Sequence, residues 1–196
     1  MPIFRRRPPP RRRRFPLRRR PLASSPAARR ALKKLRQAHT MMAQGNPADA
    51  ATIFADLADA AVIRGIPRAP QLNLQAGRAW IEAGEVDKGL ARVRDGLQRM
   101  ATMGQFGRLP IVGRRVLDEL LRRGLSQEAT LVETDLQRLL ATVGLSLADA
   151  SGKSPVPRLP TKCNYCGGSV IPDEVDWLDD QLAACSYCGS PLEAKA

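Results

Sequence analysis

The arrangement of the cysteines constrains the fold of this chain more than any other sequence feature. All four cysteines lie near the end of the sequence, as the pairs Cys163/Cys166 and Cys185/Cys188, with eighteen residues between the pairs. Two cysteines separated by two residues turn both sulfurs to the inside of one tight turn, and two such turns supply the sulfur tetrahedron that Zn²⁺ prefers. The sequence therefore predicts one structural zinc ion held by these four residues.

The residues around the cysteines fit a small metal-held β structure. A glycine follows each pair directly, at Gly167 and Gly189, where a positive φ lets the backbone turn tightly around the sulfurs. Residues 174–178 and 181–184 have the pattern of two short strands joined by a turn at Asp179-Asp180. These features resemble a zinc ribbon, which implies a structural or binding module whose metal has four protein ligands and no open position for catalysis.

Two alternatives to zinc remain open. The cysteines form disulfides if the protein is in an oxidising compartment, and iron in a rubredoxin-like site takes the same sulfur tetrahedron. Zinc is favoured because the chain shows neither a secretion signal nor a redox-partner motif. A segment as short as residues 162–196 buries too little apolar surface to fold alone, so we expect the metal to contribute most of its stability.

The net charge of +13 is concentrated at the N-terminus. Residues 1–48 carry 15 of the 32 basic side chains and no acidic one, which leaves 17 basic and 19 acidic side chains, a net charge of −2, for residues 49–196. Residues 163–196 are acidic, with six acidic side chains and one lysine, a net charge of −5. Arguments from charge about binding partners therefore apply to the N-terminal residues alone.

Residues 1–26 are predicted to be a disordered arm with polyproline II character, because like charges repel along it and its prolines disfavour helix and sheet. Its ten arginines favour contact with a polyanion, either a nucleic acid or an anionic membrane surface, although arginine does not distinguish between them. A solvated tail that only aids solubility is the alternative. The candidate polyanion-binding residues are Arg5, Arg6, Arg7, Arg11, Arg12, Arg13, Arg14, Arg18, Arg19 and Arg20.

Residues 27–145 are rich in alanine and leucine and are predicted to form six helices. Gly45, Gly84 and Gly124 recur at intervals of 39 and 40 residues, each between two segments with apolar residues every three or four positions. Small residues such as Gly77 and Gly89 recur around them, at points where two antiparallel helices have to approach closely. The predicted helices are residues 28–44, 47–64, 70–83, 86–103, 110–123 and 126–143.

This pattern resembles the tetratricopeptide repeat, in which helical hairpins stack into a solenoid. The units are five or six residues longer than the family's unit of about 34 residues, and we place the extra length in Gly/Pro connectors at residues 64–70 and 104–110. The resemblance implies a mostly α fold of three antiparallel helical hairpins. A linker at residues 146–161 then leads to the small β zinc ribbon at residues 162–196.

In this family the first helix of each hairpin contributes to an inner surface that holds extended peptides, with basic residues gripping carboxylates. Mapping the repeat onto that surface selects Arg78, Arg114 and Arg122 as the basic candidates, and ordinary ion pairs with Glu82 and Asp118 are the alternative role for them. The candidate protein-binding residues are His39, Met42, Gln71, Arg78, Glu82, Arg114, Asp118 and Arg122.

Catalysis is not expected of this chain. His39 is its only histidine and the predicted metal site uses every cysteine, so neither a Ser-His or Cys-His pair nor a thiol nucleophile remains. Residues 151–154 lack the preceding glycine of a phosphate-binding loop. No apolar run approaches the roughly 20 residues that span a bilayer, and no export signal is evident, so we expect a cytoplasmic protein.

These observations predict a non-enzymatic interaction adaptor. The helical repeats would bind a partner protein, the zinc ribbon would add a second contact surface, and the basic arm would tether the assembly to something anionic. The alternative is a nucleic-acid-binding protein that contacts RNA or DNA through the arm, which the acidic ribbon disfavours because it repels phosphate. A third interpretation is intramolecular, with the acidic ribbon holding the arm. The sequence specifies neither the partner nor the oligomeric state.

Overall fold

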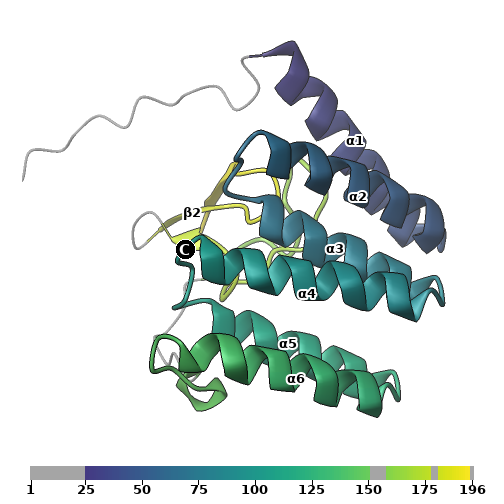
Figure 1. The fold of residues 1–196 in the computed structure, drawn as a ribbon. Helices are drawn as coiled ribbons and strands as arrows, with labels where there is room; N and C mark the ends of the chain where they lie inside the picture. The colour runs from purple at the N-terminus through teal and green to yellow at the C-terminus, as the bar shows by residue number, and fades with distance from the viewer. Residues whose placement is uncertain (1–24, 151–157, 178–180, 195–196) are drawn as a thin grey trace, which may run out of the picture.

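The computed structural model describes residues 25–150, 158–177 and 181–194 (Figure 1). Almost all of the predicted arm therefore lies outside the described residues, as do residues 151–157 of the predicted linker and the predicted turn at Asp179-Asp180. The described part is mostly helical, with one small antiparallel sheet near its C-terminal end. None of its helices combines the length and the apolar character needed to cross a membrane.

The six predicted helices are confirmed, each to within two residues at both ends. They follow one another in chain order from the top to the bottom of Figure 1. Their bounds are α1 Pro26–Ala43, α2 Pro47–Ile63, α3 Ala69–Glu82, α4 Val86–Thr102, α5 Leu109–Arg122 and α6 Ser126–Ala141. A 3-10 helix, η1 (Leu147–Ala150), follows in the first part of the predicted linker, where Arg114 Nη2 of α5 donates to the Leu147 carbonyl at 2.7 Å.

Each of the six helices ends at the same kind of turn. A glycine with positive φ follows the helix, and the next residue donates its N–H to a carbonyl five residues earlier, as Asn46 does to Met41 and Glu85 to Trp80, both at 2.9 Å. This is the glycine-dependent Schellman ending. The glycines are Gly45, Gly65, Gly84, Gly104, Gly124 and Gly144. Gly45, Gly84 and Gly124 were predicted between the two helices of each hairpin, and Gly65 and Gly104 in the connectors between hairpins; Gly144 was not predicted.

Small residues bring α3 and α4 into direct backbone contact, as predicted. A Cβ atom on Gly77 would lie 2.8 Å from the Gly89 carbonyl oxygen, and one on Gly89 would lie 2.8 Å from the Gly77 carbonyl oxygen. Ala38 and Ala50, at the equivalent positions of α1 and α2, are completely buried. The glycine and alanine positions of the repeat are therefore required by packing.

The buried apolar residues form two clusters. One joins α4, α5 and α6 with Leu74 of α3. The other joins α1, α2 and α3, and it also contains cysteine and aliphatic side chains from the described part of residues 162–194, which we call the C-terminal segment. Cys163, Val175 and Leu192 are among them. The C-terminal segment is therefore part of a core that it shares with the first three helices.

The sheet of the C-terminal segment has three strands in the order β1-β2-β3, all antiparallel. They are β1 Asp176–Trp177, β2 Leu182–Ala184 and β3 Pro191–Glu193, with Trp177 and Leu192 on either side of Ala183. The two predicted strands are confirmed in shorter form. The third strand was not predicted, because proline and glutamate are poor strand formers and a single buried leucine gives no alternation.

Candidate metal centre and its contact with the helices

The four cysteine sulfurs lie close enough together to bind one metal ion. All four Sγ atoms are within 4.8 Å of one another, with 3.7 Å between those of Cys163 and Cys188 and 3.8 Å between those of Cys166 and Cys185. A tetrahedron with metal–sulfur bonds of about 2.3 Å has edges of about 3.8 Å, so the arrangement is consistent with zinc. All four cysteines are free rather than disulfide-bonded in this structure.

The two cysteine turns have the same backbone structure. Gly167 N–H donates to the Cys163 carbonyl at 2.9 Å, and Gly189 N–H donates to the Cys185 carbonyl at 2.8 Å. Both glycines have a positive φ, at 76° and 74°, which confirms the prediction from their position after each pair. The repeated turn presents two sulfurs from each side to a common centre.

The centre is shielded from solvent. Cys163, Cys166 and Cys185 are buried, while Cys188 is half-buried and its sulfur lies 3.0 Å from the Ser190 hydroxyl. Hydrogen bonds from the other three cysteines hold the pKa of Cys163 well below the usual range of a thiol. Metals bind cysteine as the thiolate, so an ion held at this centre would keep the sulfurs deprotonated.

An aromatic contact attaches the second cysteine turn to the helices. Tyr187 is buried against His39 of α1, with ring centroids 5.4 Å apart, and its hydroxyl accepts a hydrogen bond from Gln75 of α3 at 2.5 Å. His39 also packs edge-on against Phe54 of α2. Burial lowers the pKa of His39 to about 4 and raises the pKa of Tyr187 to about 12, so both rings are uncharged at neutral pH.

A buried carboxylate attaches the strand region to α3 and α5. The Glu174 side chain is 7% exposed, and its Oε1 lies 2.5 Å from Arg115 Nη1 and 3.7 Å from Arg78 Nη2. Arg78 also pairs with Glu119 at 3.0 Å. The helices therefore contribute two arginines and the carboxylate of Glu119 to this contact, and the C-terminal segment contributes the carboxylate of Glu174.

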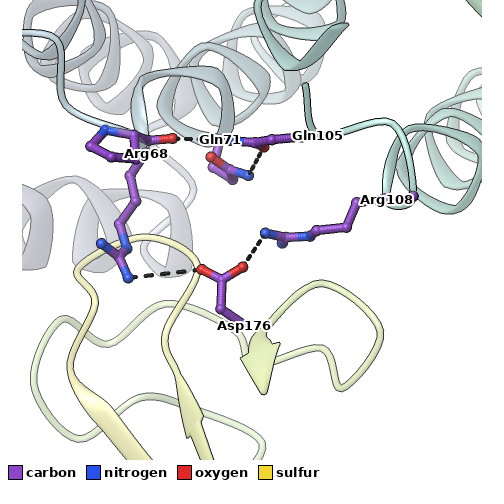
Figure 2. Close-up of a pocket in the computed structure, with 7 residues that line it drawn as sticks. Arg68, Gln71, Gln105, Arg108 and Asp176 are labelled. Atoms are coloured by element: carbon purple, nitrogen blue, oxygen red, sulfur yellow. Dashed lines mark hydrogen bonds and ion pairs between the residues drawn. The ribbon is translucent and has the colours of Figure 1, made fainter. Parts of the chain in front are cut away.

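A second carboxylate lies between the two inter-helix connectors (Figure 2). Arg108 Nη1 donates to Asp176 Oδ1 at 2.6 Å, and Arg68 Nη2 lies 3.8 Å from Asp176 Oδ2. Arg68 also donates to the Cys185 carbonyl at 3.1 Å, and Arg108 donates to the Glu174 carbonyl. A cavity of about 270 Å³ lies beside these groups, with Gln71 and Gln105 on its wall.

These ion pairs offset much of the negative charge of the C-terminal segment. Asp173 is also paired, with Arg115 at 3.6 Å. Three of the acidic side chains that were expected to repel phosphate are thus held against arginines of the helices.

The C-terminal segment covers part of the predicted peptide-binding surface. His39 and Arg78 contact it directly, Gln71 is buried beside Asp176, and Met42 is half-buried in the shared core. Arg114, Asp118 and Arg122 on α5 stay exposed, and Glu82 pairs with Arg123. Arg78 does not pair with Glu82 or Asp118; it pairs with Glu119 and Glu174 instead.

Sequence reasoning missed several residues that hold the C-terminal segment, although the repeat contains a signal for them. Arg36, Gln75 and Arg115 occupy the same repeat position, 39 and 40 residues apart, and contact Tyr165, Tyr187 and Glu174 respectively. Arg68 and Arg108 are likewise 40 residues apart in the two connectors. Aligning the polar residues of the repeat, in addition to the apolar ones, would have identified these positions.

No family model, no curated protein and no solved structure matches this chain in the comparisons that we made. The fold and the site define only a class: a mostly helical protein with a four-cysteine centre that is positioned to hold a metal ion and is packed against the helices.

Proposed function

We propose that this protein is a non-enzymatic interaction adaptor, built from a tetratricopeptide-like array of three helical hairpins and a structural zinc ribbon. The observation that carries the proposal is the way in which the helices hold residues 173–176 of the same chain. Arginines from α3, α5 and both connectors contact the carboxylates of Asp173, Glu174 and Asp176. A helical surface that grips the carboxylates of a short chain segment has the chemistry needed to hold an acidic peptide.

Zinc is the metal we propose for the cysteine centre. Four thiolate ligands that are shielded from solvent leave no position for a substrate, which suits a structural ion. Elemental analysis of the purified protein should find one zinc per chain. Iron in its place would move the proposal to an electron-transfer protein.

We propose that the protein is not an enzyme, because its cysteines and its histidine are already engaged in other contacts. All four cysteines belong to the candidate metal centre. The imidazole of His39 is packed between Phe54 and Tyr187, and its lowered pKa keeps it uncharged at neutral pH. Neither a thiol nor an imidazole is therefore available to a substrate.

We place the partner-binding surface on the portion of α5 that the C-terminal segment leaves uncovered. Arg114, Asp118 and Arg122 are exposed there. Arg114 and Asp118 line a cavity of about 220 Å³ together with Leu117 and Leu121. The mixture of arginine, aspartate and leucine suits a protein partner with both acidic and apolar groups. The predicted arm would act as a tether, as part of the same proposal.

Affinity capture with matched charge variants tests the adaptor role. The immobilised full chain is compared with Arg114→Glu/Arg122→Glu and with the control Arg64→Glu/Arg138→Glu, in which two exposed arginines elsewhere receive the same change of charge. We expect a protein that is retained by the wild type and the control and is lost by the first variant. Equal retention by all three proteins, or no specific protein on any of them, would overturn the assignment.

A further inference from the structure

The first helix differs in charge from the rest of the described helical region. Five basic residues and no acidic residue lie within Pro26–Ala43, and all five are exposed. They are Arg29, Arg30, Lys33, Lys34 and Arg36. By contrast, nine arginines outside α1 form ion pairs in the described part of the chain. Within that part, Lys34 is the one basic residue of α1 with an ion pair, at 4.0 Å from Asp56.

This charge pattern is unfavourable for α1 in isolation. Arg29 and Arg30 lie in the N-terminal part of the helix, where the helix dipole favours negative charge. Arg29 and Lys33 are four residues apart, as are Arg30 and Lys34, and like charges at this spacing repel. A bound polyanion would reverse both effects.

The first cysteine turn extends this basic surface. Arg36 donates a hydrogen bond to the Tyr165 carbonyl, which fixes the turn against α1. Tyr165 is 41% exposed, although most other large apolar side chains of the C-terminal segment are buried or half-buried. Lys162 and Asn164 on the same turn are also exposed. An exposed aromatic ring beside a row of cations is the combination with which proteins stack and hold unpaired bases.

The side chains of α1 favour a nucleic acid over a membrane. Lipid binding by a helix requires an apolar face that is free to enter the bilayer. Leu32, Leu35, Met41 and Met42 of α1 are instead packed in the first apolar cluster, and none of the large exposed hydrophobic side chains of the described residues belongs to α1. The acidic residues of the ribbon do not oppose the idea, because Asp173, Glu174 and Asp176 are paired with arginines of α3, α5 and the connectors.

We infer that α1 and the first cysteine turn form a folded binding surface for single-stranded nucleic acid, with the cations of α1 on the phosphates and Tyr165 stacked on a base. The inference goes beyond the adaptor role and does not depend on it. It also assigns to folded residues a contact that the sequence analysis gave to the N-terminal arm alone. The surface would read charge and exposed bases, with little base specificity.

The test uses fluorescence anisotropy with labelled poly(U) and poly(dT) oligonucleotides of equal length, titrated over a range of salt concentrations. All proteins are full-length. To remove the contribution of the arm, one set carries glutamine in place of the ten arginines between Arg5 and Arg20. In this set we compare the parent with Arg29→Glu/Arg30→Glu/Lys33→Glu and with the control Arg64→Glu/Arg138→Glu/Arg158→Glu, which has the same change of charge at three exposed arginines elsewhere.

The α1 variant should bind at least tenfold more weakly than the control. The slope of log affinity against log salt should fall by about 2, since each lost phosphate contact on a single strand contributes about 0.7. Loss of folding should not mimic this result, because all three replaced side chains are exposed and the new glutamate at position 30 faces Lys34 with the opposite charge. Circular dichroism of the variant checks its folding. Tyr165→Ala should weaken binding without changing the slope, and Tyr165→Phe should bind like the parent.

Each of the following results would overturn the inference. In the first, the α1 variant and the control bind alike, or the parent of the arm-substituted set does not bind either oligonucleotide at low salt. In the second, Tyr165→Ala binds as tightly as its parent, which would show that Tyr165 does not stack on an unpaired base. In the third, phosphatidylserine vesicles compete more effectively than the oligonucleotides, which would assign α1 to a membrane surface. A preference between poly(U) and poly(dT) distinguishes RNA from DNA and is compatible with the inference in either direction.

Discussion

Glu174 is the side chain on which the contact between the C-terminal segment and the helices depends most. It is nearly buried, it neutralises Arg115 of α5 and Arg78 of α3 at once, and its own carbonyl accepts from Arg108. A buried charge that loses its partner costs far more free energy than an exposed one, because water does not solvate the group left behind. The negative charge at this one position therefore matters to Arg115 and Arg78, whereas Arg108 contacts the backbone carbonyl only.

Glu174→Gln should lower the free energy of unfolding by about 2 kcal/mol, because Arg115 and Arg78 each lose one nearly buried counter-charge, while Asp173 and Glu119 stay beside them. Glu193→Gln, at an exposed position of β3, is the matched control and should have little effect. Urea denaturation followed by circular dichroism measures both changes. Equal unfolding midpoints for the two variants would show that the Glu174 contact does not stabilise the fold.

The ion pair between Asp59 and Arg92 should make the free energy of unfolding depend on pH. Hydrogen bonds from Arg92 lower the pKa of Asp59 below its usual value of 3.8. A lowered carboxyl pKa means that the stabilisation is complete above the unfolded-state value and is lost as the pH falls through the folded-state value. Because Asp59 is largely exposed, the pair contributes at most about 1 kcal/mol.

Asp59→Asn should therefore be less stable than the wild type at neutral pH, by up to about 1 kcal/mol, and the difference should vanish in strong acid. Asp118→Asn, an exposed carboxylate on α5, serves as the control. Thermal unfolding across the acidic range follows both. A difference for Asp59→Asn that is constant at every pH would contradict the assigned pair.

At the level of elements, the close contact between α3 and α4 requires residues without a side chain at two positions, Gly77 and Gly89. Gly77→Ala should lower the free energy of unfolding by about 2 kcal/mol, since the added methyl group overlaps the Gly89 carbonyl and Val93, and this outweighs the gain in helix propensity. Gly107→Ala is the control, because no atom lies within 4 Å of its added Cβ. Equal free energies of unfolding for the two variants would show that α3 and α4 accommodate the added methyl group without loss of stability.

The elements were predictable because their signals are local. Gly45, Gly84 and Gly124 end helices through their own positive φ, and Gly77 and Gly89 mark a close approach within one repeat unit. The position of the C-terminal segment was not predictable in the same way. Arg36 meets Tyr165, and Gln75 meets Tyr187, across more than a hundred residues of chain, and no periodicity of apolar residues encodes such a contact.

At the scale of the whole molecule, the cysteine centre and the first three helices share one apolar core. The metal would therefore stabilise more than its own ligands, because Tyr187 and Glu174 reach the helices from elements that four cysteines hold together. The second cluster, around α4, α5 and α6, contains no residue of the C-terminal segment within the described part of the chain. Metal removal should thus affect the two halves of the helical array unequally.

Amide hydrogen exchange of the full chain, before and after removal of its metal by a chelator, tests this account most directly. We predict that the described residues of the C-terminal segment lose protection, that α1 and α3 exchange faster as the surface around His39 and Arg78 is uncovered, and that α6 is unchanged. Faster exchange confined to the C-terminal segment, with α1 and α3 as protected as before, would contradict the claim that the metal centre and the helices form one structural unit.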